Sequence, residues 1–302
     1  MFSLLWIPAT IAASFLQVAR NALQRGMMGA AGPWGATLVR FLFGLPFSLL
    51  FAALAWWATP QLAPHFGPAF WTAATGGAFS QVAATACLLI AMERAGFAVG
   101  TALQQSSLPL AAVLGLIVYH DGMSGIAWAG IAITTSGLAA LTWPFSGPSR
   151  QAATGPRPVS GAAFGLASGL CFGFSLNAFR HAALAVNAAH PVFSALASVA
   201  IVQAMQAAGL TLALALWNRA ALRAVIANWR GSLGAGLLGA CASACWFFAL
   251  ALSPAAPVRA LGVVEAPIAA WAGRRLFSER LHLRQILAGG AVMIGVVLTT
   301  LY

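Results

Sequence analysis

Glu265 carries the one carboxylate that lies near the middle of a long apolar segment. The chain has four acidic residues, and the other three, Glu93, Asp121 and Glu279, fall at the predicted ends of such segments. An ionised group deep in an apolar environment costs about 3 kcal/mol or more unless it is paired or faces water. Glu265 is therefore expected to line an internal cavity, where it binds a cationic group or takes up a proton.

Two arginines are candidate partners for this carboxylate. Arginine stays protonated and makes fork-like contacts with carboxylates. Arg40 and Arg259 are therefore each expected either to hold a substrate carboxylate or to form a structural ion pair with Glu265. Arg259 follows Pro257 by two residues, so a position at the water interface is an equally good interpretation for it. For Arg40 a buried role is favoured.

Neutral polar side chains inside apolar segments form a second set of candidates: Gln81, Gln104, Gln105, Ser107 and Asn177. The run 104–107 covers more than one face of a helix, so one or two of its side chains are expected to reach the cavity. The alternative for Gln81 and Asn177 is a hydrogen bond between helices.

Aromatic residues offer an apolar wall for the same cavity. Trp246, Phe247 and Trp271 are the candidates. The competing interpretation, which holds for most aromatic residues in such segments, is packing or contact with lipid.

Other chemistries find little support in the sequence. The glycines between 231 and 239 lack the preceding strand and the acidic partner of a nucleotide-binding loop, and no Walker A motif is present. Cys241 and Cys245 are four residues apart, but no histidine or carboxylate accompanies them to complete a metal site. We expect no cofactor, no metal, no nucleic-acid partner and no enzymatic activity.

Composition determines which elements must position these residues. The chain has 302 residues, of which 61% are hydrophobic and 6% charged. A soluble globule of this size would have too little polar surface to cover itself. The sequence therefore predicts an all-α integral membrane protein.

Ten segments are long and apolar enough to be membrane spans of roughly 20 residues each. Their expected limits are Phe2–Arg20, Pro33–Trp57, Pro68–Met92, Gly96–Tyr119, Ser124–Trp143, Gly161–Arg180, Pro191–Trp217, Gly231–Leu252, Pro257–Phe277 and Leu283–Leu301. The glycines of the sixth segment, at 165, 169 and 173, predict close helix packing. The connection 219–230 is basic.

The two halves of the chain match at a constant spacing of 158 residues. The matched pairs include Leu103/Leu261, Pro109/Pro267, Gly115/Gly273, Asp121/Glu279 and Gly137/Gly295. We expect one repeat at 1–147, a Pro-, Gly- and Ser-rich linker at 148–159, and a second repeat at 160–302. Five spans per repeat is an odd number, so the copies must cross the membrane in opposite senses, as in secondary transporters.

The number of spans and the repeated pattern of proline, acid and glycine resemble the drug/metabolite transporter superfamily and its EamA group. The resemblance covers essentially the whole chain. It implies ten helices in two inverted five-helix repeats around a central cavity, and export of amino acids, related metabolites or drugs.

All 15 basic residues are arginine, and most follow odd-numbered spans. The positive-inside rule then puts both termini on the non-cytoplasmic side of the inner membrane, although many relatives in the superfamily have cytoplasmic termini.

The function expected from the sequence is alternating-access export of a small molecule, coupled to protons. An uncoupled facilitator and a non-transporting membrane subunit are the alternatives. A monomer and a homodimer are equally compatible with the sequence.

Overall fold

A computed structural model describes residues 4–59, 62–120, 122–142, 158–277 and 283–300, and every regular element in these ranges is a helix. The thirteen helices are α1 (Trp6–Leu42), α2 (Leu45–Ala58), α3 (Pro68–Ala95), α4 (Phe97–Gln104), α5 (Ser107–Tyr119), α6 (Gly125–Thr142), α7 (Pro158–Asn187), α8 (Pro191–Trp217), α9 (Arg219–Ala227), α10 (Trp229–Leu252), α11 (Ala255–Gly262), α12 (Glu265–Leu276) and α13 (Leu283–Thr300).

The predicted all-α membrane class is confirmed. Within the described ranges, six helical stretches are long and apolar enough to cross a membrane: Trp6–Ala58, Pro68–Ala95, Phe97–Ile117, Ser160–Asn187, Pro191–Trp217 and Trp229–Leu252. The protein is therefore embedded in a membrane. The predicted limits of the span at Pro191–Trp217 coincide with those of α8.

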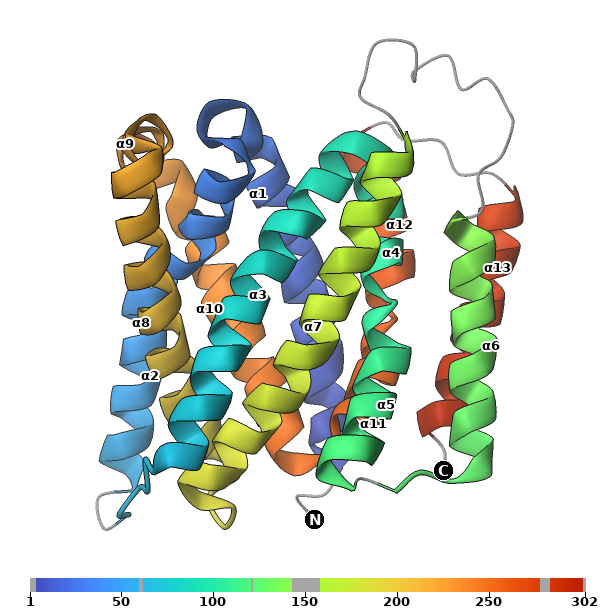
Figure 1. Ribbon diagram of the computed structural model, residues 1–302, viewed down its shortest axis with the longest axis horizontal. Coiled ribbons are helices and arrows are strands. Elements are labelled where there is room, and N and C mark those ends of the chain that lie inside the picture. The colour runs from blue at the N-terminus through green and yellow to red at the C-terminus, as the bar shows by residue number, and fades with distance from the viewer. Residues whose placement is uncertain (1–3, 60–61, 121, 143–157, 278–282, 301–302) are drawn as a thin grey trace.

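The first helix reverses direction at Gly32, whose φ of 66° and ψ of 176° are accessible to glycine and strained for other residues. Pro33 follows and starts the second arm, where its missing N–H costs nothing. Gln24 Nε2 in the first arm donates to the Ala36 carbonyl in the second at 2.7 Å. Figure 1 shows this reversal at the end of the bundle where α9 lies, opposite the two chain termini.

Two helical pairs, α4–α5 and α11–α12, are each interrupted next to a proline. Pro109 and Pro267 lack an N–H and their rings crowd the carbonyls of Gln105 and Val263, four residues earlier. Those carbonyls instead accept from Leu108 N at 3.0 Å and Ala266 N at 2.8 Å, three residues on. Each break is thus a short stretch of tighter helix, the geometry that marks hinges and functional sites.

The bundle is built from closely packed pairs: α3 with α7, α1 with α10, and α6 with α13. The glycine ridge predicted for close packing is confirmed on α7. A Cβ at Gly169 would lie 1.9 Å from Ser106 Oγ and 3.0 Å from Ser107 N. The ridge therefore places α7 directly against the break between α4 and α5.

Three expectations concern the connections between the predicted spans. The basic connection at 219–230 is largely an amphipathic helix, α9, capped by Asn218, whose side chain accepts from Ala221 N. The linker expected at 148–159 lies outside the described residues except for 158 and 159, which belong to α7. Asp121 and Glu279 also lie outside the described residues.

Candidate functional site

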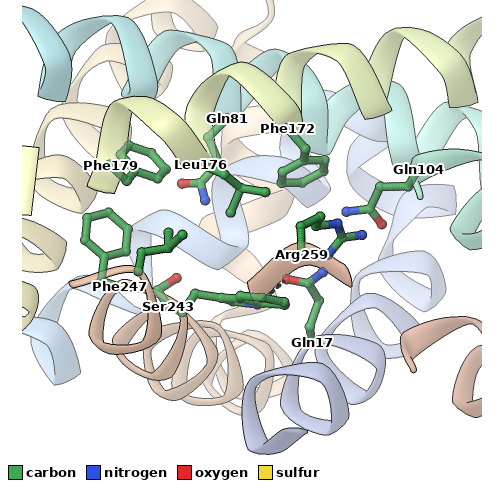
Figure 2. A pocket seen from close by; sticks show the side chains of 11 residues that line it. Gln17, Gln81, Gln104, Phe172, Leu176, Phe179, Ser243, Phe247 and Arg259 are labelled. Carbon is green, nitrogen blue, oxygen red and sulfur yellow. Dashed lines mark hydrogen bonds between the residues drawn. The ribbon is translucent and has the colours of Figure 1, made fainter. Parts of the chain in front are cut away.

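A small cavity lies between the packed helices, with a volume of about 20 Å³. Its lining comprises Gln17, Gln81, Gln104, Phe172, Leu176, Phe179, Ser243, Trp246, Phe247, Leu250 and Arg259. Figure 2 shows Phe179 and Phe247 at one end and Gln17, Gln104 and Arg259 at the other. The two phenyl rings stack with their centroids 4.5 Å apart. The cavity therefore has an aromatic end and a polar, cationic end.

The carboxylate of Glu265 lies beside the polar end and is completely buried. It accepts hydrogen bonds from Gln17 Nε2 at 2.8 Å, from Arg259 Nη1 at 3.2 Å and from Gln105 Nε2 at 3.4 Å. Glu265 is also the first residue of α12, where the helix dipole favours a negative charge. The ion-pair partner is Arg259 rather than Arg40.

Arg259 is buried, with 2% of its surface exposed, so it does not extend to the water interface. Its Nε donates to Ser107 Oγ at 2.6 Å, and its Nη2 donates to Gln105 Oε1. It stands in the last turn of α11, where the dipole favours a cation. The interrupted pair α11–α12 thus supplies the ion pair, and the interrupted pair α4–α5 supplies Gln105 and Ser107 as two of its partners.

Gln17 joins this network to the aromatic wall. Its Oε1 accepts from Trp246 Nε1 at 3.0 Å while its Nε2 donates to Glu265. The guanidinium of Arg259 lies 5.7 Å from the centre of the Trp246 ring, within range of a cation–π contact. Trp246 therefore lines the cavity through its ring and orients Gln17 through its indole N–H.

Arg40 is buried near the cavity but outside the ion pair. Its Nη1 donates to Thr85 Oγ1 at 3.1 Å and its Nη2 to Ser243 Oγ at 3.2 Å. Since Ser243 lines the cavity, Arg40 lies one side chain behind its wall.

The remaining candidates divide between the cavity and the helix contacts. Gln81 and Gln104 line the cavity, and Gln81 Oε1 also accepts from Gln206 Nε2 at 2.7 Å. Asn177 bonds across helices instead, from Nδ2 to the Ala111 carbonyl at 3.1 Å. Trp271 is 62% exposed and does not belong to the cavity wall, because it occupies the outer face of α12.

Sequence reasoning missed a polar stripe on α1. Thr10, Ser14, Gln17, Arg20, Asn21 and Gln24 recur at the spacing of one helix face, and all are buried. Their periodicity within an apolar segment was the available signal. Arg20 was assigned to the end of a span, as a topology marker, and that assignment was wrong: its side chain is completely buried.

The volume of the cavity restricts what this arrangement can do as it stands. About 20 Å³ is room for roughly one water molecule, whereas a small-molecule site occupies roughly 300 Å³ or more. A metabolite would enter only if the surrounding helices moved apart. Among the described residues, no group of three or more His, Cys, Asp or Glu side chains could hold a metal ion.

Comparison with known proteins supports the fold alone. No family model matches the chain, and no curated protein does either. A solved structure described as "Crystal structure of protein" is similar over 99% of this chain and 98% of its own, with 18% sequence identity and a TM-score of 0.64. At that identity the similarity extends to the arrangement of helices and not to an activity.

Proposed function

We propose that this protein is a secondary transporter, a proton-coupled exporter of small metabolites or drugs that works by alternating access. The observation that carries the proposal is the buried Arg259–Glu265 pair, which flanks the break between α11 and α12 and lies beside a small cavity. Discontinuous helices at the centre of the membrane are a recurrent feature of substrate and ion sites in transporters.

Helix boundaries support the proposed internal repeat. α4 begins at Phe97 and α11 at Ala255, and α6 begins at Gly125 and α13 at Leu283, in both cases 158 residues apart. The breaks repeat as well. The backbone bonds Gln105 N to Ala102 O and Val263 N to Ala260 O, at 3.0 and 3.1 Å, have the same offset.

The packing also has the symmetry that an inverted repeat requires. Under the same shift α1 corresponds to α7 and α3 to α10, so the pair α1–α10 exchanges with the pair α7–α3. Two of the buried arginines, Arg259 and Arg40, each bridge a pair of positions that are 158 residues apart. Arg259 contacts Ser107 and Glu265, and Arg40 contacts Thr85 and Ser243.

We further propose that the chain belongs to the drug/metabolite transporter superfamily, EamA group, with ten spans in two inverted five-helix repeats. Six spans rest on length and composition. The other four would come from division of the stretch Trp6–Ala58 at Gly32, from α6, from the interrupted pair α11–α12 and from α13.

The geometry suggests how a proton would be coupled to a solute. Protonation of Glu265 would cancel its charge and weaken the hold of Arg259 on α12, because a charge-assisted contact would become a neutral one. The short tight turns at the breaks would then bend and open the cavity to one side. A solute bound at the polar end would either stabilise the deprotonated, charged form of Glu265 or compete with that form for Arg259.

Orientation follows from the distribution of arginine. The exposed arginines of α9 and of the first turn of α10, Arg219, Arg223 and Arg230, lie at the end of the bundle opposite the termini. The positive-inside rule makes that end cytoplasmic in the inner membrane and puts the termini outside. Either a monomer or a homodimer would serve this mechanism.

Proton movement in proteoliposomes tests the proposal. Liposomes containing the wild type or Glu265→Gln would be challenged with amino acids, amines and nucleosides while the internal pH is followed. We expect at least one compound to move protons through the wild type and not through Glu265→Gln. The exposed substitution Arg223→Gln is the matched control and should behave as wild type.

Two other results would contradict the proposal and favour a different function. Equal flux of a labelled compound in both proteins without proton movement would make Glu265 a structural partner of Arg259 and the protein a facilitator. No flux of any compound through the wild type would favour a non-transporting membrane subunit.

A further inference from the structure

The buried charges around the cavity do not balance. Among the described residues the buried charged side chains are Arg20, Arg40, Arg259 and Glu265. Glu265 is paired with Arg259, which leaves two buried guanidinium groups with no carboxylate as a direct partner.

These two arginines are neighbours. Arg20 in the first arm of α1 and Arg40 in the second arm meet at Gly239 of α10. A Cβ at Gly239 would lie 3.1 Å from Arg40 Cγ and 3.3 Å from Arg20 Cδ. Two positive charges this close to each other repel. A pair of like charges in the interior is favourable only when something negative accompanies it.

The unpaired hydrogen-bonding groups at this place are mainly donors. Within the part of the chain that the structure describes, Arg20 Nε, Arg20 Nη1, Arg40 Nε and Asn21 Nδ2 are buried and lack an acceptor. Arg20 Nη2 is satisfied by Asn21 Oδ1 at 2.6 Å. Gln24 Oε1, one turn further along α1, is the nearby acceptor left without a donor. It cannot balance four donor atoms.

We infer that Arg20, Arg40 and Asn21 form an oxyanion site that takes the carboxylate or phosphate group of the transported solute. An oxyanion supplies the missing negative charge and several acceptor oxygens together. A water molecule would supply acceptors and leave the charge unbalanced. The role of the bound group as cargo rests on the proposed transport function, whereas its binding can be measured without transport.

The position of the site fits an entry route. Arg20 lies three residues beyond Gln17 on α1, about 4.5 Å along the axis toward the reversal at Gly32. Arg40 reaches the cavity wall through Ser243. The oxyanion site therefore lies between the cavity and the end of the bundle that carries α9. A solute arriving from that end would meet Arg20 and Arg40 before the Arg259–Glu265 pair.

Thermal unfolding of the full-length protein in a neutral detergent free of anionic lipid tests the inference. The probes are sodium phosphate and sodium acetate, each compared with sodium chloride at equal ionic strength, with tryptophan fluorescence as the readout. We expect at least one oxyanion to raise the wild-type Tm by about 2 °C or more. A response to phosphate alone or to acetate alone would identify the oxyanion.

Variants assign the effect to the site. Arg20→Gln and Arg40→Gln should lose the oxyanion-dependent shift, Asn21→Ala should reduce it, and Arg223→Gln on exposed α9 should keep it. A wild-type Tm that is equal in all three salts would overturn the inference, even if the buried variants failed to fold. A full shift retained in Arg20→Gln would overturn it as well.

The two proposals fail in different ways. An oxyanion-dependent shift in Tm without flux of any tested compound would support the oxyanion site and contradict the transport function. Proton-coupled flux without a shift in Tm would support the transport function and contradict the oxyanion site.

Discussion

At the scale of single residues, Arg259 and Glu265 depend on each other because both are buried. Each is 2% or less exposed, and each would be an uncompensated charge if its partner were removed. The surrounding amides of Gln17 and Gln105 bond to the charged groups without replacing either charge. The pair should therefore be required for stability, in addition to its proposed role in proton coupling.

Arg259→Gln alone is expected to destabilise the protein by about 3–5 kcal/mol, because it leaves Glu265 buried and charged. The double substitution Arg259→Gln with Glu265→Gln should recover most of that loss. Equilibrium unfolding in detergent measures both, with exposed Arg223→Gln as the control, expected within about 0.5 kcal/mol of wild type. Additive losses in the double variant would mean that the two side chains are not coupled.

The sequence identified the centre of the site better than its surroundings. Glu265 stood out as the one acid within an apolar segment, and the ion pair with Arg259 was one of two alternatives. Gln17 was missed because a single amide in a long apolar helix does not by itself indicate a site. The signal appears only when the polar residues from Thr10 to Gln24 are considered together as one face of the helix. Arg20 was misassigned because positions near a predicted span end favour a topology role.

At the scale of helices, prolines and glycines create the site. Pro109 and Pro267 break two helices at the level of Ser107 and Glu265, and the glycines of α7 allow it to lie against one of the breaks. The limits of α8 were predictable from the sequence. The breaks were not, because proline in a membrane helix is tolerated with or without a local change in hydrogen bonding.

Substitution of Gly169 by alanine tests the close approach of α7 to the α4–α5 break. Its new Cβ would overlap Ser106 Oγ, so we expect a loss of about 1–3 kcal/mol in unfolding free energy. Gly209→Ala in α8, where nothing lies within 4 Å, is the matched control and should be neutral or stabilising by up to about 1 kcal/mol. Equal effects of the two substitutions would show that the contact is not tight.

Pro267→Ala tests whether the break in α11–α12 serves movement. Restoring an N–H and removing the ring should allow a straighter helix, leaving Tm unchanged or higher while proton-coupled flux falls severalfold. Pro191→Ala, at the start of α8 where no preceding turn is disturbed, is the control. Full flux through Pro267→Ala would show that transport does not require the break in α11–α12.

At the scale of the whole molecule, the offset of 158 residues relates helix limits, breaks and helix pairs at once. The inverted repeat that we propose would have two exchangeable halves, and such halves are the physical basis for opening a central site to either side. The sequence predicted the offset directly, since it needs no gap. It could not predict that the cavity would be as small as about 20 Å³, because that volume depends on how the side chains of several helices pack together.

Cysteine labelling in intact cells tests the orientation. In a variant lacking the four native cysteines, Val192→Cys at the start of α8 should react with an impermeant maleimide from outside. Arg223→Cys on α9 should react only after permeabilisation. Both positions are exposed, so accessibility of the side chain is matched. The reverse pattern would put the termini in the cytoplasm.

Solute counterflow tests the alternating-access claim most directly. Proteoliposomes preloaded with an excess of one unlabelled compound from the amino-acid, amine and nucleoside panel would receive a trace of the same compound, labelled, outside. A carrier with one site exposed alternately to the two sides predicts a transient accumulation of label above its equilibrium level, for at least one compound, that vanishes in protein-free liposomes. Monotonic equilibration or no entry for every compound would contradict a carrier mechanism.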